Sequence, residues 1–334
     1  MNRLQRGFRK VRKRLARSRG VILMYHRVAA ADIDPWELCV SPRNFAEHLQ
    51  VLQSEARPLG LREFARLNRE GRLPERAVAI TFDDGYADNL YHARPLLETY
   101  GIPATVFVAA GYIGKGEEFW WDELARRLFG PGKLPEKLAL EFDGKIERWE
   151  VGTDSDASRN HSLTTAPPGS RLHLYRSLWQ RLLPLADDER RWRLREIARW
   201  AGGEGEARAD DLPLDRPELE KLADSEAIEI GAHTLTHPFL PARPPAEQRD
   251  EIREGKKRLE EMLDRPVTSF SYPFGGYTPE TIEGVRAAGF DLACSTVTES
   301  CWRQSERWQL PRPGVGDWNG EEFSRQLARW FTDD

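Results

Sequence analysis

Short apolar runs alternate with amphipathic helical patterns through most of this chain, and this alternation limits the folds that it can adopt. The apolar runs predict buried strands over residues 21–25, 78–82, 104–110, 228–231, 267–272 and 292–296. Helical spacing predicts helices from Pro42 to about Leu52, up to Tyr100, and over 245–263, 278–288 and about 323–331. Strands that alternate with helices are typical of a parallel sheet with crossover helices, so the sequence predicts an α/β fold.

The alternation lapses between about residues 115 and 215. This stretch is rich in Trp, Arg and Glu, contains a polar region near 152–170, and has the spacing of one helix from about 172 to 200. Because strand and helix alternate again after it, we expect a mainly helical insertion that forms a lid or subdomain.

Composition excludes several classes of protein. The chain has 334 residues, 40% of them hydrophobic and 31% charged, with a net charge of −4, which is typical of a globular protein without a general affinity for nucleic acid. The three cysteines have no paired spacing, so neither a disulfide framework nor a cysteine zinc cluster is expected, and a reducing compartment is favoured. No apolar stretch approaches the roughly 20 residues of a membrane-spanning helix.

The first 19 residues form a basic segment. Nine of them are Lys or Arg and none is acidic, and Leu4, Phe8, Val11 and Leu15 recur at helical spacing. This pattern predicts peripheral contact with an anionic membrane, with a disordered basic tail as the alternative. Because no long apolar core follows the charges, a secretory signal is not expected, and we predict a cytoplasmic protein at the inner face of the membrane.

Adjacent carboxylates, Asp83 and Asp84, end the apolar run at 78–82 and precede Gly85. Successive strand side chains point to opposite faces, so the two carboxylates diverge unless the backbone bends there, and Gly85 permits a bend. Buried carboxylates are costly unless they are protonated, paired or bound to a metal. An ordinary turn is the alternative reading of Asp followed by Gly.

A histidine pair, His233 and His237, follows the run at 228–231. Four residues apart, both side chains would face the same way on one helical turn, which suits two imidazoles on one metal. Sites in α/β folds gather at the carboxyl ends of strands, so this pair and the Asp83-Asp84 pair are expected to meet. One carboxylate and two imidazoles would hold a metal, and the other carboxylate would remain free as a base.

The strand end at 270–277 reads Phe-Ser-Tyr-Pro-Phe-Gly-Gly-Tyr. Its ordinary interpretation is a turn after a strand. Its functional interpretation is a pocket wall in which Tyr272, Pro273 and Phe274 contact substrate and backbone N–H groups meet an oxyanion.

These three segments resemble, in order, the first three motifs of the polysaccharide deacetylases, the NodB-homology or carbohydrate esterase 4 group. They are Thr-Phe-Asp-Asp-Gly at 81–85, His-Thr-Leu-Thr-His at 233–237 and Ser-Tyr-Pro-Phe-Gly at 271–275. The segments Leu-Met-Tyr-His-Arg-Val at 23–28 and Ser-Pro-Arg-Asn-Phe at 41–45 are also similar to members of that group. The resemblance covers roughly residues 20–115 and 215–315 and leaves the insertion unmatched. It implies a distorted (β/α) barrel, with residues 20–334 forming one catalytic domain interrupted at about 115–215.

The resemblance also implies an activity, the metal-dependent removal of N-acetyl, occasionally O-acetyl, groups from sugars. Asp84, His233 and His237 would bind the metal, usually Zn²⁺, and Asp83 would be the general base. The expected partner is an N-acetylated carbohydrate, which is a polysaccharide, an oligosaccharide or a glycan precursor. Two alternatives are an O-acetyl esterase with the same site and a saccharide-binding protein whose barrel has lost turnover. A membrane-surface scaffold that acts through the basic segment is a third.

The chain departs from the family pattern in two places. The late motif that supplies an acidic histidine in many relatives reads Leu-Pro-Arg-Pro-Gly-Val at 310–315, and no histidine follows His237. Ser271 stands where an arginine often pairs with the base. We therefore predict His26, at a strand end, as the general acid, with a structural histidine as the alternative. Arg312 is predicted to contact substrate, and Arg312 or Arg27 to replace the missing cation.

Tryptophans are the remaining candidates for contact with substrate. Flat aromatic faces suit sugar C–H surfaces, although burial in a core is the commoner fate of Trp. We expect at most two of these five to touch substrate: Trp120, Trp121, Trp302, Trp308 and Trp318.

Overall fold

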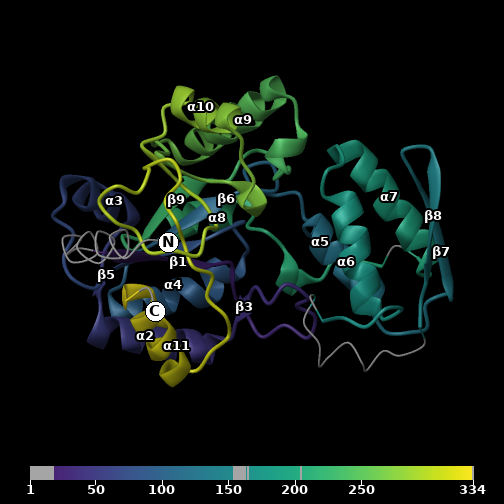
Figure 1. Cartoon of the computed structure of the whole chain (residues 1–334), viewed down its shortest axis with the longest axis horizontal. Helices are drawn as coiled ribbons and strands as arrows, with labels where there is room; N and C mark the ends of the chain where they lie inside the picture. Colours follow the sequence, from purple (N-terminus) through teal and green to yellow (C-terminus); the bar gives the residue numbers. More distant parts are fainter. Residues whose placement is uncertain (1–18, 153–162, 164, 204, 333–334) are drawn as a thin grey trace, which may run out of the picture.

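The structure is a computed structural model that describes residues 19–152, 163, 165–203 and 205–332 (Figure 1). The basic segment therefore lies almost wholly outside the described residues, and its membrane contact stays a prediction. Within the described residues, no helix is long and apolar enough to cross a membrane.

A parallel sheet forms the centre of the molecule. Its hydrogen-bonded order is β1-β5-β6-β9-β10-β11, and β4 pairs with the start of β5. The strands are β1 (Gly20–Tyr25), β4 (Arg57–Pro58), β5 (Ala77–Phe82), β6 (Ala104–Val108), β9 (Ile228–Ala232), β10 (Ser269–Ser271) and β11 (Leu292–Cys294). Every residue of β5 and β6 is buried, as expected for strands covered on both faces. All six predicted strands are confirmed.

An irregular segment, residues 310–315, bridges the two edge strands of this sheet. Leu310 pairs with Cys294 of β11, and Gly314 pairs with Met24 of β1. The N–H groups of Met24 and Val315 donate to the carbonyl oxygens of Pro313 and Met24, respectively. The curled sheet with this bridge is the distorted (β/α) barrel that the sequence predicts, and the bridge carries Arg312 into its interior.

Helices surround the sheet (Figure 1). They are α2 (Pro42–Glu55), α3 (Leu61–Glu70), α4 (Arg94–Tyr100), α8 (Arg216–Ala223), α9 (Pro245–Leu263), α10 (Pro279–Ala287) and α11 (Gly320–Thr332), and a π-helical turn (Asn89–Ala93) precedes α4. The helices predicted outside the insertion are confirmed, and the Ser41 side chain caps α2 by accepting from the Asn44 N–H. A small parallel pair, β2 (Arg27–Val28) and β3 (Cys39–Val40), was not predicted because two-residue strands carry no periodicity.

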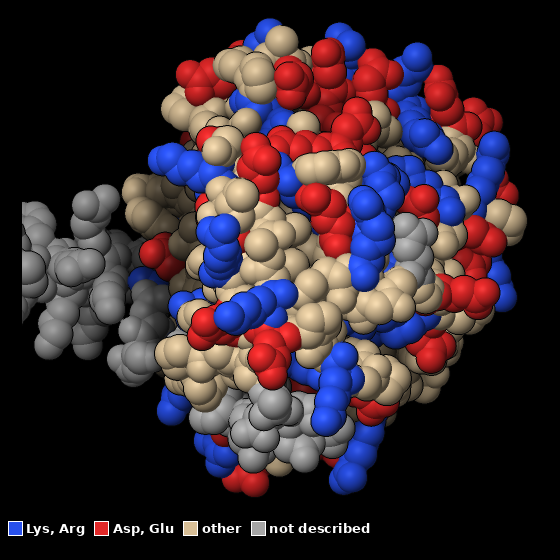
Figure 2. Space-filling model, turned by 90° about the vertical axis from the view of Figure 1, so that its right-hand side faces the viewer, with Lys and Arg blue, Asp and Glu red and all other residues tan. Residues whose placement is uncertain are grey.

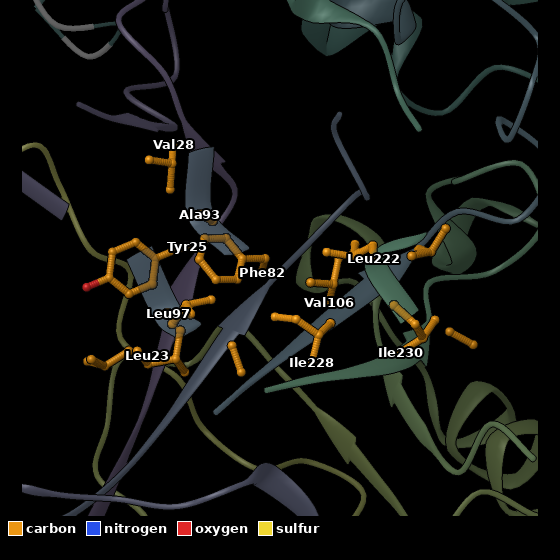
Figure 3. Close-up of a cluster of buried hydrophobic side chains, with 14 of the residues drawn as sticks. Leu23, Tyr25, Val28, Phe82, Ala93, Leu97, Val106, Leu222, Ile228 and Ile230 are labelled. Atoms are coloured by element: carbon orange, nitrogen blue, oxygen red, sulfur yellow. The ribbon is translucent and has the colours of Figure 1, made fainter. Parts of the chain in front are cut away.

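The main core lies between the sheet and the helices that cover it. Figure 3 shows side chains of β1, β5, β6, β9, α4 and α8 meeting there, among them Leu23, Phe82, Val106 and Ile230. Each such side chain contributes about 1.5–3 kcal/mol when it is fully buried. This packing fixes the strands, and therefore the positions of the loops at their carboxyl ends.

The insertion is a helical subdomain with one hairpin. It contains α5 (Trp120–Phe129), β7 (Lys137–Phe142), β8 (Lys145–Glu150), α6 (Arg171–Leu182) and α7 (Asp187–Trp200). The predicted single helix over 172–200 is wrong, because the chain breaks after Leu182, where Pro184 cannot continue the helical hydrogen bonds. The antiparallel hairpin was also missed, although Asp143-Gly144, both with positive φ, is a strong signal for its two-residue turn.

The insertion packs against the barrel through a shared apolar cluster. Tyr86, Ala109 and Tyr112 of the barrel join side chains of α5, α6 and α7 in one buried group. On the outer face of this subdomain, Lys and Arg are interspersed with Asp and Glu among the described residues (Figure 2). That face has no single-sign patch of the kind that binds nucleic acid.

Candidate metal centre and active-site pocket

The two carboxylates at the end of β5 lie where the backbone bends. Asp84 has φ 75° and Gly85 has φ 83°, so the chain leaves the extended conformation directly after Asp83. A left-handed conformation is unusual for a non-glycine residue and is often found at functional sites. The bend brings Asp83 and Asp84 to the same pocket, as the sequence predicts.

The histidines follow β9 on an irregular loop and not on a helical turn, so that part of the prediction is wrong. Thr234 and His237 have φ 66° and 56°, which no α-helix contains. Glu251 of α9 holds the loop, because its carboxylate accepts from the N–H groups of Leu235 and Thr236 at 3.0 and 2.8 Å. The loop thus turns both imidazoles inward by backbone geometry rather than by helical spacing.

Glycine lets α9 approach this loop closely. A Cβ added to Gly255 would lie 2.5 Å from the carbonyl carbon of Thr234, far inside van der Waals contact. Gly255 therefore allows the helix to press against the backbone between the two histidines.

Asp84, His233 and His237 converge on one point. The Asp84 Oδ1 atom lies 3.5 Å from His233 Nε2 and 3.1 Å from His237 Nε2, and all three residues are at most 4% exposed. Their candidate ligand atoms lie within 4.8 Å of one another, and they are one carboxylate oxygen and two imidazole nitrogens. This donor set is the one that a three-ligand zinc site uses.

The hydrogen bond of His233 supports metal binding. Its Nδ1 lies 2.8 Å from the carbonyl oxygen of Ser271, which can only accept, so Nδ1 carries the proton. In the neutral ring, Nε2 then presents a lone pair toward the Asp84 carboxylate. Two acceptors that face each other in a buried site require a cation between them, and the residues therefore fit a divalent metal.

The electrostatics of the site also suit a metal. Burial lowers the pKa of His237 to about 4, so this imidazole is neutral at pH 7 and can offer a lone pair. Burial alone would raise the pKa of Asp84, but the neighbouring His233 and His237 outweigh burial and hold that pKa well below its usual range. The site therefore presents the negative charge of Asp84 beside the neutral imidazole of His237.

Asp83 has a cation of its own. Arg312 donates from both terminal nitrogens to the two Asp83 oxygens, at 2.8 and 2.7 Å. It also donates to the hydroxyls of Ser271 and Thr81, and its side chain is fully buried. Burial would raise the pKa of Asp83, but the Arg312 charge outweighs burial and keeps that pKa below its usual value. Asp83 is thus held as an oriented carboxylate and needs no metal to remain charged.

Ser271 and Arg312 together replace the arginine that the third motif lacks. The shorter Ser271 side chain leaves room for the guanidinium, which enters from the bridging segment and donates to the Ser271 hydroxyl at 2.7 Å. Arg27 is not the substitute. It pairs at 2.9 Å with Asp88 and also with Asp211, away from Asp83.

A pocket of about 300 Å³ contains the site. Its polar lining consists of His26, Asp83, Asp84, His233, His237 and Thr296. Its apolar lining consists of Trp36, Leu38, Trp121, Trp179 and Phe274. The predicted acid, His26, thus lies in the same pocket as Asp83, and its side chain makes no hydrogen bond among the described residues.

Three residues predicted to bind substrate lie in other surroundings. The N–H of Tyr272 donates to the carbonyl oxygen of Cys294, and its hydroxyl donates to that of Trp308, so neither faces the pocket. Pro273 is buried and does not line the pocket, and Arg312 lies beneath Asp83 rather than beside substrate. Phe274 does line the pocket, with φ 55° turning its ring toward His237 at a centroid distance of 4.6 Å.

Sequence reasoning missed several residues of the site. Trp36 and Trp179 reach the pocket from a loop and from the insertion, and neither lies beside a motif. Of the five tryptophans considered from sequence, Trp121 lines the pocket and the other four do not. Glu251 could not be recognised from the sequence, because α9 contains many other charged residues. Gly255 could have been, because a glycine inside a helix often marks a close contact with another part of the chain.

Comparison with known families and structures agrees with the geometry. The family model described as polysaccharide deacetylase matches residues 70–132 and 197–293, two stretches that reach into the insertion from either side and carry the Asp83-Asp84 and His233-His237 pairs. The chain belongs to the polysaccharide deacetylase family. Members of this family are hydrolases, and the first two motifs quoted above occupy the matched residues of this deacetylase.

Relatives of the deacetylase include proteins of two bacteria. YxkH of Bacillus subtilis (strain 168), which carries the same family name, is 22% identical over 296 residues, or 88% of this chain and 70% of YxkH. Poly-β-1,6-N-acetyl-D-glucosamine N-deacetylases of Staphylococcus aureus are 38% identical over 77 residues. That match spans 23% of this chain and only 27% of the Staphylococcus proteins.

Solved structures share the fold. The deacetylase PplD of Streptococcus pyogenes, solved in complex with acetate, has a TM-score of 0.58 and 17% identity over 92% of this chain and 98% of PplD. IcaB from Ammonifex degensii has a TM-score of 0.58 and 19% identity over 94% of this chain and 97% of IcaB. Both similarities include the insertion region in their coverage, and they establish the distorted barrel.

Proposed function

We propose that this deacetylase removes N-acetyl groups from an N-acetylated saccharide and that it requires a divalent metal, most favourably Zn²⁺. The observation that carries the proposal is that the two adjacent carboxylates have different partners. Asp84 joins two imidazoles in a three-ligand set, while Asp83 is kept apart from it by Arg312. The similarity to N-deacetylases of poly-N-acetylglucosamine supports the same substrate class.

Asp84, His233 and His237 would hold the ion. A metal bound there supplies Lewis-acid chemistry, which makes water a nucleophile near neutral pH and polarises an acyl oxygen. The three ligands leave an open side toward the pocket, where the acetyl group and a water molecule can enter.

Asp83 is positioned to take a proton from the attacking water. Both of its oxygens are fixed by Arg312, so the carboxylate cannot rotate away, and it lines the pocket beside the ligand set. Within the described residues, Oδ2 accepts from Arg312 and from the Ser271 hydroxyl, whereas Oδ1 accepts from Arg312 alone and keeps a lone pair that can accept a proton. The apolar side chains that line the pocket lower the local dielectric, which strengthens the electrostatic interactions of the charged groups.

His26 is the proposed acid for the leaving amine. It lies in the pocket, and its side chain makes no hydrogen bond within the part of the chain that the structure describes, so its ring can donate a proton to a substrate nitrogen. We expect His26→Ala to lower kcat by about 100-fold and to remove the basic limb of the pH–rate profile. His92→Ala is the matched control, because that histidine bonds the Val28 carbonyl outside the pocket. A wild-type profile for His26→Ala would show that His26 is not the acid, and Asp83 would then donate to the amine the proton that it took from water.

The test of the proposed function is acetate release. Purified protein with added Zn²⁺ is incubated with a panel of N-acetylhexosamine oligomers and O-acetylated sugars, and acetate and bound metal are measured. We expect about one metal per chain and acetate from the N-acetyl substrates, with no release after chelation. Release from O-acetyl sugars alone would replace the proposal with an esterase. Bound metal without any acetate release would support a saccharide-binding protein.

A further inference from the structure

Two tryptophans outside the family motifs, Trp36 and Trp179, join Phe274 of the third motif in an aromatic group beside the metal ligands. Trp36 comes from the β2–β3 loop, Trp179 from α6 of the insertion, and Phe274 from the segment after β10. The ring centroids of Trp36 and Trp179 are 4.5 Å apart, and those of Trp179 and Phe274 are 5.8 Å apart. Three distant parts of the sequence thus place rings side by side at one pocket.

These three rings are not simply part of the insertion core. The neighbouring aromatics Phe119 and Trp121 are at most 4% exposed, whereas Trp36, Trp179 and Phe274 remain partly exposed. Partly exposed aromatic rings that line a concave pocket are typical of ligand sites, which are mainly apolar with a few polar groups. The exposed parts of these three rings therefore form a surface that a ligand can contact.

The rings are held in place by the protein. The Asp34 carboxylate accepts from the N–H groups of Leu38 and Cys39, at 2.9 and 2.8 Å, and this fixes the loop that carries Trp36. Trp121 packs against Phe274 with ring centroids 5.4 Å apart, and its own indole N–H is held by the Tyr86 hydroxyl, to which it donates at 2.9 Å. A binding surface that is ordered before the ligand arrives loses less entropy on binding.

We propose that Trp36, Trp179 and Phe274 form an aromatic clamp that binds the neutral hexosamine ring bearing the acetyl group. This inference rests on the proposed function and adds the substrate contacts to it. An acetyl group that reaches the metal ligands places its sugar ring against the clamp, and the apolar C–H face of a pyranose suits aromatic faces.

The charge and size of the pocket decide the class of sugar. Among the described residues, neither Lys nor Arg lines the pocket, and its two carboxylates belong to the reaction centre. A phosphate or carboxylate on the sugar would therefore find no Lys or Arg of the described chain to pair with at the clamp. At about 300 Å³, the pocket lies at the small end of the range for ligand sites, so it suits one sugar ring rather than a long segment of polymer.

Trp179 offers the sharpest test, because it is the contribution of α6 and lies far from the motifs. We expect Trp179→Ala to raise the KM for neutral N-acetylglucosamine oligomers about tenfold, with a smaller change in kcat. Inhibition by acetate, which is too small to span the clamp, should keep its wild-type constant. Trp179→Phe should restore most of the affinity because it keeps a ring.

The control is Trp192→Ala on α7 of the same subdomain. This indole is 42% exposed and does not line the pocket, so KM should stay within about twofold of wild type. Thermal unfolding of each variant separates a lost contact from a lost fold. If Trp179→Ala kept the wild-type KM, the clamp would be overturned while deacetylation stood. If wild-type enzyme released acetate from no saccharide, the proposed function would fail, and the clamp with it.

Discussion

Asp83→Asn is expected to reduce acetate release by about 1,000-fold while leaving metal content unchanged. An amide cannot accept the proton of water as a carboxylate does, but it has nearly the same shape and still accepts from Arg312. The metal should remain, because Asp84, His233 and His237 form the ligand set without Asp83. Acetate release and metal stoichiometry measured on the same preparation check both parts.

The contrasting variant is His237→Ala, which should lose the metal together with the activity. His237 Nε2 lies 3.1 Å from Asp84 Oδ1, and its removal leaves two ligands. Asp88→Asn is the matched control for Asp83→Asn, because Asp88 is equally buried and also pairs with an arginine, but it does not line the pocket. If Asp83→Asn lost metal, Asp83 would be a ligand; if it kept activity, another group would be the base.

The strand ends were predictable because two independent signals coincide at each of them. An apolar run marks β5, and the adjacent carboxylates that follow it are too costly to bury without a partner. The histidines follow β9 in the same way, and parallel strands place their carboxyl ends together. The metal ligands were therefore brought together by reasoning about topology alone.

The wrong expectations concern local geometry and distant partners. The spacing of His233 and His237 suggested a helical turn, but the interactions with α9 impose two left-handed residues instead. Trp179 has the spacing of a core residue in an amphipathic helix, and nothing local shows that its face meets a loop about 140 residues earlier. Such contacts depend on how the insertion docks on the barrel, which periodicity does not encode.

The pairing of Arg312 with Asp83 also could not be decided from the sequence. The sequence shows that the base lacks its usual arginine, but two candidates remained, and 229 residues separate Arg312 from Asp83. The barrel decides between them, because the bridging segment runs between β11 and β1 and turns Arg312 inward under β5. Arg27, although closer in sequence, is paired with Asp88.

Arg312→Met is expected to lower the free energy of unfolding by about 3–5 kcal/mol in the metal-saturated protein. The substitution leaves Asp83 buried without its cation and removes donors from Thr81 and Ser271. Activity should also fall, because the Asp83 carboxylate loses the two guanidinium hydrogen bonds that orient it. Arg312→Lys should recover only part of the loss, since an ammonium cannot donate to both oxygens in one plane.

A double-mutant cycle that combines Arg312→Met with Asp83→Asn measures the interaction energy between these two side chains, apart from other effects of each substitution on stability. A neutral amide needs no counter-charge, so Arg312→Met should cost less in the Asp83→Asn background, with a coupling energy of about 1–3 kcal/mol. Denaturant unfolding of the four proteins measures it. Costs that add to within about 0.5 kcal/mol would show that the two side chains act independently. A clear coupling would mean that this deacetylase has moved the cation of its base from the third motif to the segment that closes the barrel.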